Sequence, residues 1–282
     1  DRCGCTVGIE SIMTLDDNGR SSNTQFKRYV GIDYSGAETP TSGLKGLRVY
    51  MATSEDEAEE VMPPSGPKRY WTRQAVAHWL LETLSQPTPT IVGIDHGISF
   101  PIRYFKYHQI LPDWDVFLRD FRRHWPTDEP HVYVDFVRDG LAGNGAARTG
   151  NAKWRRITEQ RCKAKSVFHF GCQGSVAKST HSGIPWLLFL RERLGKDVHF
   201  WPFDGLSVPQ RRSSIVEAYP ALYKHRFPAT QEMTGDQHDA YAIAHWLKLA
   251  DASGELQIAL HPDLDPGMQT LARVEGWILG VG

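Results

Sequence analysis

The sequence predicts an α/β fold, in which short buried strands alternate with amphipathic helices. Apolar runs that end in an acidic residue occur at residues 29–33 (YVGID) and 91–95 (IVGID), each with a glycine two residues before the acid. A helical pattern lies between these runs, and a strongly amphipathic helical pattern follows at 236–249. Continuous apolar runs suit central strands that are covered on both faces, and their alternation with helices is typical of α/β proteins.

The size and composition of the chain favour one enlarged domain. It has 282 residues, of which 40% are apolar, and 32 basic against 33 acidic side chains, which excludes a highly charged disordered chain. At roughly 150 residues per domain, the length corresponds to one large or two small domains. We interpret residues 1–25 as a flexible leader and 26–282 as one domain with a helical insert at about 99–195. The net charge of −1 excludes a histone-like polycation but not a local basic patch.

In the first half of the domain, a strand hairpin is expected to precede a helix. Residues 47–51 form a second strand-like run, which we expect to pair with 29–33. Thr72 is a favoured N-cap residue, and the apolar pattern after it predicts a helix that runs to about Leu84. The run at 91–95 then provides the next strand.

In the second half, the pattern predicts further helices and strands on either side of residue 195. Pro185 lies near the start of one predicted helix and Gly195 follows its end, which is a favoured arrangement. The apolar segment 277–279 is placed to dock on the core. We expect helices at 114–125, 153–165 and 184–194, and strands at 198–203 and 214–219, with a short apolar run at 132–134.

The cysteines and the hydropathy pattern favour a cytoplasmic protein. The four cysteines are too few for a disulfide scaffold and lack the spacing of a zinc site, so we interpret them as free thiols in a reducing compartment; they are Cys3, Cys5, Cys162 and Cys172. No window approaches the 18 or so apolar residues of a membrane span, and no secretory signal is visible.

Acidic residues at the ends of the predicted strands are the most informative pattern. Asp33 and Asp95 end two apolar strands, Glu217 lies inside a third, and Asp236 and Asp239 share one face near a helix N-terminus. Gathering carboxylates is unfavourable because they repel one another and lose hydration, and a divalent cation removes that penalty. Mg²⁺ prefers such oxygen ligands, and paired ions support phosphodiester cleavage. The pattern therefore predicts a Mg²⁺ or Mn²⁺ site formed by these five residues.

Each acid also has a structural interpretation. Asp33 and Asp95 can cap turns or helices, and Asp236 can be only an N-cap. Glu217 can point to solvent or pair with an arginine, and Asp239 can be an ordinary helix residue. The order of strand-Asp, hairpin, helix, strand-Asp, strand and D-x-x-D helix is more specific than any single acid.

These motifs resemble the DUF429 family of predicted nucleases with a ribonuclease H-like fold. The resemblance rests on residues 29–36, 91–101, 216–220, 238–242 and 275–278, and it covers roughly 28–280. It implies a mixed β-sheet flanked by helices, with a catalytic acidic metal site formed by Asp33, Asp95, Glu217 and Asp239. The long basic insert and the segment before residue 26 depart from the family pattern.

A basic segment in the insert is the candidate nucleic-acid contact. Residues 143–165 contain seven basic side chains and one acid, a local charge of +6. Such a segment can hold phosphates, and Trp154 can stack on a base; the alternative is a solvated basic helix with Trp154 in the core. The glycine-rich stretch 171–180 lacks the P-loop spacing and is either a loop near the site or a plain connection. The predicted nucleic-acid contacts are Arg148, Lys153, Trp154, Arg155, Arg156 and Lys178.

Three functions follow from these patterns. The first is a metal-dependent nuclease or phosphodiesterase that acts on DNA or RNA. The second is a catalytically silent ribonuclease H-like domain that binds nucleic acid. The third is an ATP-dependent phosphotransferase of the actin and sugar-kinase type, because residues 31–36 resemble the first phosphate loop of those enzymes. His238, beside Asp239, is either a proton donor or a capping residue.

Overall fold

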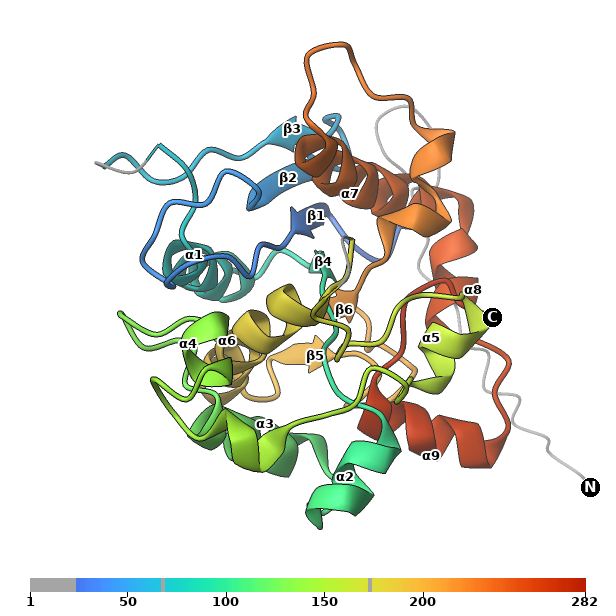
Figure 1. The fold of residues 1–282 in the computed structure, drawn as a ribbon. Helices are drawn as coiled ribbons and strands as arrows, with labels where there is room; N and C mark the ends of the chain where they lie inside the picture. Colours follow the sequence, from blue (N-terminus) through green and yellow to red (C-terminus); the bar gives the residue numbers. More distant parts are fainter. Residues whose placement is uncertain (1–23, 67–68, 172–173) are drawn as a thin grey trace, which may run out of the picture.

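The computed structural model describes residues 24–66, 69–171 and 174–282 (Figure 1). Most of the predicted leader therefore lies outside the described residues, as do Cys3, Cys5 and Cys172, while Cys162 is a free thiol. The predicted boundary at residue 25 needs a correction. The Gln25 side chain is 8% exposed, and its backbone N–H donates to Asp251 Oδ1 at 3.1 Å.

Six strands form one mixed sheet in the order β3-β2-β1-β4-β6-β5. The β1–β2 pair is antiparallel, so the predicted hairpin is confirmed. Strands β1, β4, β6 and β5 run parallel to one another. The strands are β1 Arg28–Asp33, β2 Arg48–Thr53, β3 Glu59–Glu60, β4 Thr90–Asp95, β5 Val198–Phe200 and β6 Ser213–Glu217.

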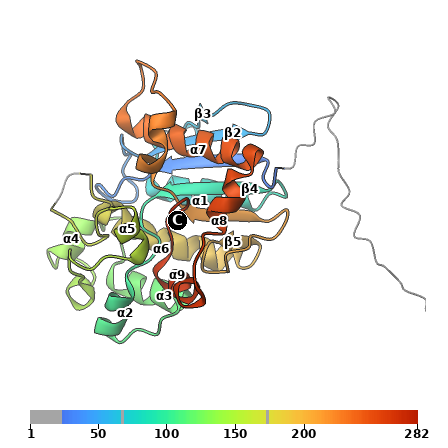
Figure 2. The same cartoon turned by 90° about the vertical axis from the view of Figure 1, so that its right-hand side faces the viewer.

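Helices cover both faces of the sheet (Figure 2). Helix α7 packs on one face, with Ile243 and Leu247 against Tyr29 and Ile91, while α1 and α6 pack on the other. The helices are α1 Arg73–Leu84, α2 Ile102–His108, α3 Trp114–His124, α4 Val134–Arg138, α5 Ile157–Arg161, α6 Ala177–Leu194, α7 Gly235–Ser253, α8 Glu255–Leu260 and α9 Pro266–Glu275, with 3-10 turns η1 Gly145–Arg148, η2 Pro220–Leu222 and η3 Lys224–Arg226.

Two glycines let α7 approach the sheet closely. Gly31 of β1 and Gly93 of β4 are direct register partners. A Cβ atom at Gly31 would lie 2.2 Å from the carbonyl oxygen of Ala240, and one at Gly93 would lie 2.6 Å from Ile243. Both distances are too short for a real Cβ contact, so α7 reaches this position only because both residues are glycine.

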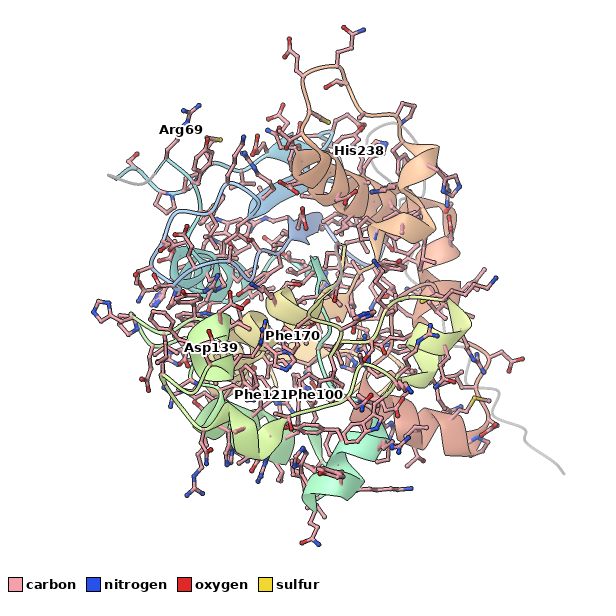
Figure 3. The ribbon with its side chains drawn as sticks, in the orientation of Figure 1. Arg69, Phe100, Phe121, Asp139, Phe170 and His238 are labelled. Carbon is pink, nitrogen blue, oxygen red and sulfur yellow. The ribbon has the colours of Figure 1, made fainter. Side chains whose placement is uncertain are left out.

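The insert between β4 and β5 is helical, as predicted, and has an aromatic core. Phe100 is fully buried, and it contacts Phe121 and Phe168 with ring centroids 5.3 and 4.5 Å apart. Figure 3 shows Phe100 and Phe121 close together in the lower part of the view, with Phe170 above them. The insert is thus a second apolar layer continuous with the core under the sheet.

Several local predictions in the insert were wrong. The basic stretch 153–165 contains only the short helix α5, because its arginines turn inward to pair with carbonyl and carboxylate groups. The short apolar run 132–134 leads into a helix, since Val134 begins α4. Helix α6 begins at Ala177, so Pro185 lies inside it. Proline frees the carbonyl four residues earlier, and the hydroxyl of Thr127 donates to that His181 carbonyl at 2.8 Å.

None of the helices in the described ranges is long and apolar enough to cross a lipid bilayer.

The contact between α7 and β1 gives a first prediction. Gly31→Ala should lower the free energy of unfolding by about 3 kcal/mol, because the methyl group must displace helix backbone rather than a flexible side chain. Gly235→Ala is the matched control: its Cβ has open space, so this variant should be neutral or slightly more stable. Urea denaturation of both variants measures the difference, and equal stabilities would contradict the packing argument.

Candidate active site

Asp33 and Asp95 lie side by side at the carboxyl edge of the sheet. They end β1 and β4 and are direct partners in the parallel register. Side chains alternate between the two faces of a strand, so both aspartates project on the same face as Gly31 and Gly93, which is the face covered by α7. Among the described residues, neither carboxylate has a hydrogen-bond or ion-pair partner.

The surroundings of this pair disfavour its negative charge. Burial, followed by the charges of Asp95, Asp236 and Asp239, raises the pKa of Asp33 to about 9. Burial, followed by the charges of Asp239 and Glu217, raises the pKa of Asp95 to about 8. Lys224 partly offsets both shifts. The protein therefore concentrates negative charge here without compensating it fully.

Helix α7 brings the other two predicted aspartates to the same place. Thr234 is the N-cap and forms a capping box with Gln237, so the N-cap interpretation of Asp236 is wrong. Asp236 lies in the first turn, where a Cβ atom at Gly46 would be 3.4 Å from its Oδ2. Asp239 accepts a hydrogen bond from Lys224 Nζ at 2.7 Å. Four predicted ligands, Asp33, Asp95, Asp236 and Asp239, thus share one face of the sheet edge.

Glu217 projects to the opposite face of the sheet from the aspartates, because its position in β6 is offset by one residue. Its register partner in β4 is Ile94, and Ile94 projects to the opposite face from Asp95. Consistent with this, the residue beside Gly93 on the α7 face is Ala218, whose Cβ would lie 3.2 Å from a Cβ atom at Gly93. Glu217 nevertheless lines the same small pocket as Asp95, so its role as a ligand shared with the aspartates stays a prediction that this register does not favour.

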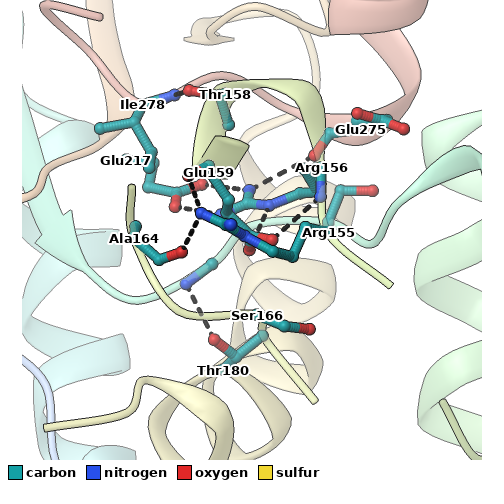
Figure 4. A network of polar contacts seen from close by, with 12 residues as sticks. Arg155, Arg156, Thr158, Glu159, Ala164, Ser166, Thr180, Glu217, Glu275 and Ile278 are labelled. Atoms are coloured by element: carbon teal, nitrogen blue, oxygen red, sulfur yellow. Dashed lines mark hydrogen bonds and ion pairs between the residues drawn. The ribbon is translucent and has the colours of Figure 1, made fainter. Parts of the chain in front are cut away.

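Glu217 forms a bidentate ion pair with Arg156, which donates to both of its carboxylate oxygens (Figure 4). Its guanidinium donates to Glu217 Oε1 and Oε2 at 2.6 Å each and to Glu159 Oε1 at 2.9 Å. Burial alone would lower the pKa of Arg156, but Glu217 and Glu159 raise it above its ordinary value. The Arg156 side chain is 1% exposed and is not accessible to a nucleic acid. Its predicted role as a nucleic-acid contact is therefore wrong.

Glu275 completes this buried network from the C-terminal side. Its side chain accepts hydrogen bonds from the backbone N–H of Ile102 at 2.7 Å and of Ile157 at 2.9 Å, the first residues of α2 and α5. Its carbonyl also faces Arg156. The network therefore fixes the insert and the C-terminal segment against β6, which explains why a strand glutamate and a C-terminal glutamate are both buried.

The other predicted nucleic-acid contacts are divided between internal and exposed positions. Arg148 forms a bidentate ion pair with Asp120, with N···O distances of 2.6 and 2.8 Å. Arg155 donates to two backbone carbonyls within the insert. Lys178 pairs with Asp135 at 2.6 Å. Lys153 is exposed, and the half-buried Trp154 contacts the Arg103 guanidinium through its ring face and the tilted ring of Tyr107. Three of the seven basic side chains of residues 143–165 are thus engaged inside the fold, whereas the remaining four, at 153, 161, 163 and 165, are exposed.

The insert nevertheless reaches the acidic edge at one point. Lys165 lines a pocket of about 20 Å³ with Asp95 and His96, which is room for about one water-sized species. Gly174 and Val176 also line it, so the glycine-rich stretch does lie near the site; residues 172–173 are outside the described residues.

Sequence reasoning missed Tyr223 and Lys224, since both follow β6 in a turn without a recognisable motif. The Tyr223 side chain is 4% exposed, its hydroxyl has no partner among the described residues, and Asp95 and Asp239 contribute to its raised pKa. The sequence left His238 as either a proton donor or a capping residue. Its Nε2 lies 2.5 Å from the carbonyl oxygen of Phe227, which favours the capping role (Figure 3).

The donor atoms fit a hard divalent cation. No group of three or more His, Cys, Asp or Glu side chains in the described ranges is already gathered as a ligand set. Mg²⁺ typically uses one or two protein carboxylates and keeps several waters, and the unpartnered pair of Asp33 and Asp95 meets that requirement. Comparisons with protein-family models, curated proteins and solved structures find no match.

The buried network gives a second prediction. Arg156→Met should lower the free energy of unfolding by about 3–5 kcal/mol, because it leaves the Glu217 charge buried without a partner. Adding Glu217→Gln should recover part of that loss. Arg148→Met removes a more exposed pair and should change stability by about 1 kcal/mol or less. If Arg156→Met were as stable as wild type and bound nucleic acid less tightly, the structural role of Arg156 would be contradicted.

The raised pKa values give a third prediction. Folding favours the protonated form of Asp33, so its contribution to the stability of the metal-free protein falls as the pH rises from about 4 to 9. Asp33→Asn should therefore raise Tm at pH 8 by about 4 °C or more, with a smaller gain at pH 5. Asp263→Asn, at an exposed position, is the control. Thermal denaturation in EDTA measures the Tm of both variants. A lower Tm for Asp33→Asn than for wild type at pH 8 would contradict the prediction.

Proposed function

We propose that this chain is a ribonuclease H-like, DUF429-type nuclease or phosphodiesterase that uses Mg²⁺ or Mn²⁺. The observation that carries the proposal is the pair of Asp33 and Asp95, in direct register at the ends of two parallel strands and without a partner among the described residues. A half-buried pair of carboxylates is unfavourable for folding, and strongly raised pKa values are a mark of functional residues. The strand-Asp, hairpin, helix, strand-Asp order of the fold supports the family assignment.

In this proposal, the strand-end aspartates bind the cation and the neighbouring residues set the charge and hydrogen bonding around it. Asp33 and Asp95 would hold the cation, and Asp236 and Asp239 would strengthen the negative field from α7. A divalent ion bound there would supply an acidified water and stabilise charge on the leaving oxygen. The Tyr223 hydroxyl, which lacks a partner among the described residues, is available to donate a hydrogen bond to a ligand in this site.

Fewer basic side chains of the insert are available to contact a phosphate backbone than the sequence pattern indicates. Arg148, Arg155 and Arg156 are engaged within the protein. Lys165, beside Asp95, and the exposed Lys153 are the insert residues best placed to hold phosphate. Such contacts would make affinity fall as salt rises.

A silent nucleic-acid-binding domain is the second candidate, and one observation favours it. Two of the five predicted acids already have an internal cation: Arg156 pairs with Glu217 and Lys224 pairs with Asp239. The phosphotransferase hypothesis gains no comparable support, since the described residues form one sheet rather than two duplicated halves.

A cleavage assay separates these candidates and gives a fourth prediction. Wild-type protein with Mg²⁺ or Mn²⁺ should cleave at least one of labelled single-stranded RNA, single-stranded DNA, duplexes or junctions, and EDTA should abolish the reaction. Asp33→Asn and Asp95→Asn should each lower the rate by about 100-fold or more, while folding remains intact by circular dichroism. Glu217→Gln serves as a comparison that leaves the aspartates in place. Nucleic-acid binding that survives Asp33→Asn, with no products from wild type, would support the silent domain.

A further inference from the structure

The acidic site already contains a positive charge that belongs to the protein. Lys224 Nζ lies 2.7 Å from Asp239 Oδ1. The same ammonium lowers the pKa of both Asp33 and Asp95, so its field reaches all three carboxylates. It lies where a divalent ion would be attracted.

The turn that carries Lys224 is fixed, but its side chain is not enclosed. Tyr223 is buried and stacks on Trp246 with ring centroids 4.5 Å apart, which anchors the backbone directly before Lys224. The Lys224 side chain is 41% exposed. A flexible four-carbon stem with a compact charge can therefore leave Asp239 for solvent without moving the turn.

Stability does not explain the ion pair. Exposed pairs of this type contribute about 0–1 kcal/mol. A second feature indicates that a ligand belongs here: the buried Tyr223 hydroxyl lies near Asp95 and Asp239, yet it has no partner among the described residues. A buried polar group without a partner is unusual in a native protein, and a ligand or water in the site would satisfy it.

We propose that Lys224 is a tethered competitor for the divalent cation: its ammonium pairs with Asp239 in the metal-free protein and leaves when the cation binds. This inference rests on the proposed metal site. An ammonium and a divalent ion at the same carboxylate repel each other, so each weakens the binding of the other. The Lys224 charge keeps the half-buried aspartates partly neutralised when no metal is present.

Direct titration with Mn²⁺ tests the inference. The full chain is treated with EDTA, dialysed and titrated with Mn²⁺ by calorimetry. Lys224→Met should bind Mn²⁺ about tenfold more tightly than wild type, as expected for the loss of one nearby positive charge. Lys224→Arg should stay within about twofold of wild type because it keeps the charge.

Lys248→Met is the matched control. Lys248 also lies on the α7 side of the molecule and pairs with an acid, Glu57 at 3.0 Å, but it is nine residues beyond Asp239 on the helix. It should leave Mn²⁺ affinity unchanged. Lys224→Gln provides a second neutral variant if Lys224→Met does not fold, as judged by thermal denaturation.

The outcomes separate this inference from the proposed function. Equal or weaker Mn²⁺ binding by the neutral Lys224 variants overturns the competition, as does the absence of Mn²⁺ binding in both wild type and variants. Tighter binding by those variants supports it, even if wild-type protein cleaves no nucleic acid. In that last case the nuclease proposal fails and the inference about Lys224 stands.

Discussion

The close approach of α7 to β1 and β4 is the constraint on which the site depends. Gly31 and Gly93 are register partners, and any side chain at either would push the helix away from the sheet. Asp33 and Asp95 follow two residues later on the same face, and α7 carries Asp236 and Asp239. The glycine before each acid therefore has a physical role: it brings a helix with two carboxylates against a strand edge with two more.

The protein compensates its buried acids selectively. On one face of the sheet, Arg156 fully satisfies Glu217 and links it to Glu159 and the insert. On the other face, the aspartates have only Lys224 among the described residues that shift their pKa values downward, and it reaches them from an exposed position. A structural carboxylate has its counter-ion built in, whereas a ligand-binding carboxylate keeps capacity for a cation. This difference separates the two groups of acids more clearly than their positions in the sequence.

Much of the fold was predictable, and the errors have local physical causes. The YVGID and IVGID runs, the Thr72 cap and the amphipathic pattern of α7 are all local signals, and each was confirmed. Glu217 lies on the opposite face from the predicted aspartates because strand phase decides which face a side chain takes, and a shift of one residue cannot be read without the register. Arg148 and Arg156 of the insert gave the appearance of a basic surface because their carboxylate partners Asp120 and Glu217 lie far away in sequence. Tyr223 and Lys224 became visible only when the turn after β6 was placed beside α7.

The most direct test of the central claim is anomalous diffraction from crystals soaked in Mn²⁺. A cation bound by the strand-end pair predicts an anomalous peak on the α7 face of the sheet, between the carboxylates of Asp33 and Asp95. The Arg156–Glu217 pair on the opposite face should remain intact. A peak at Glu217 alone, or no peak at the strand ends when Mn²⁺ is in excess, would contradict the account.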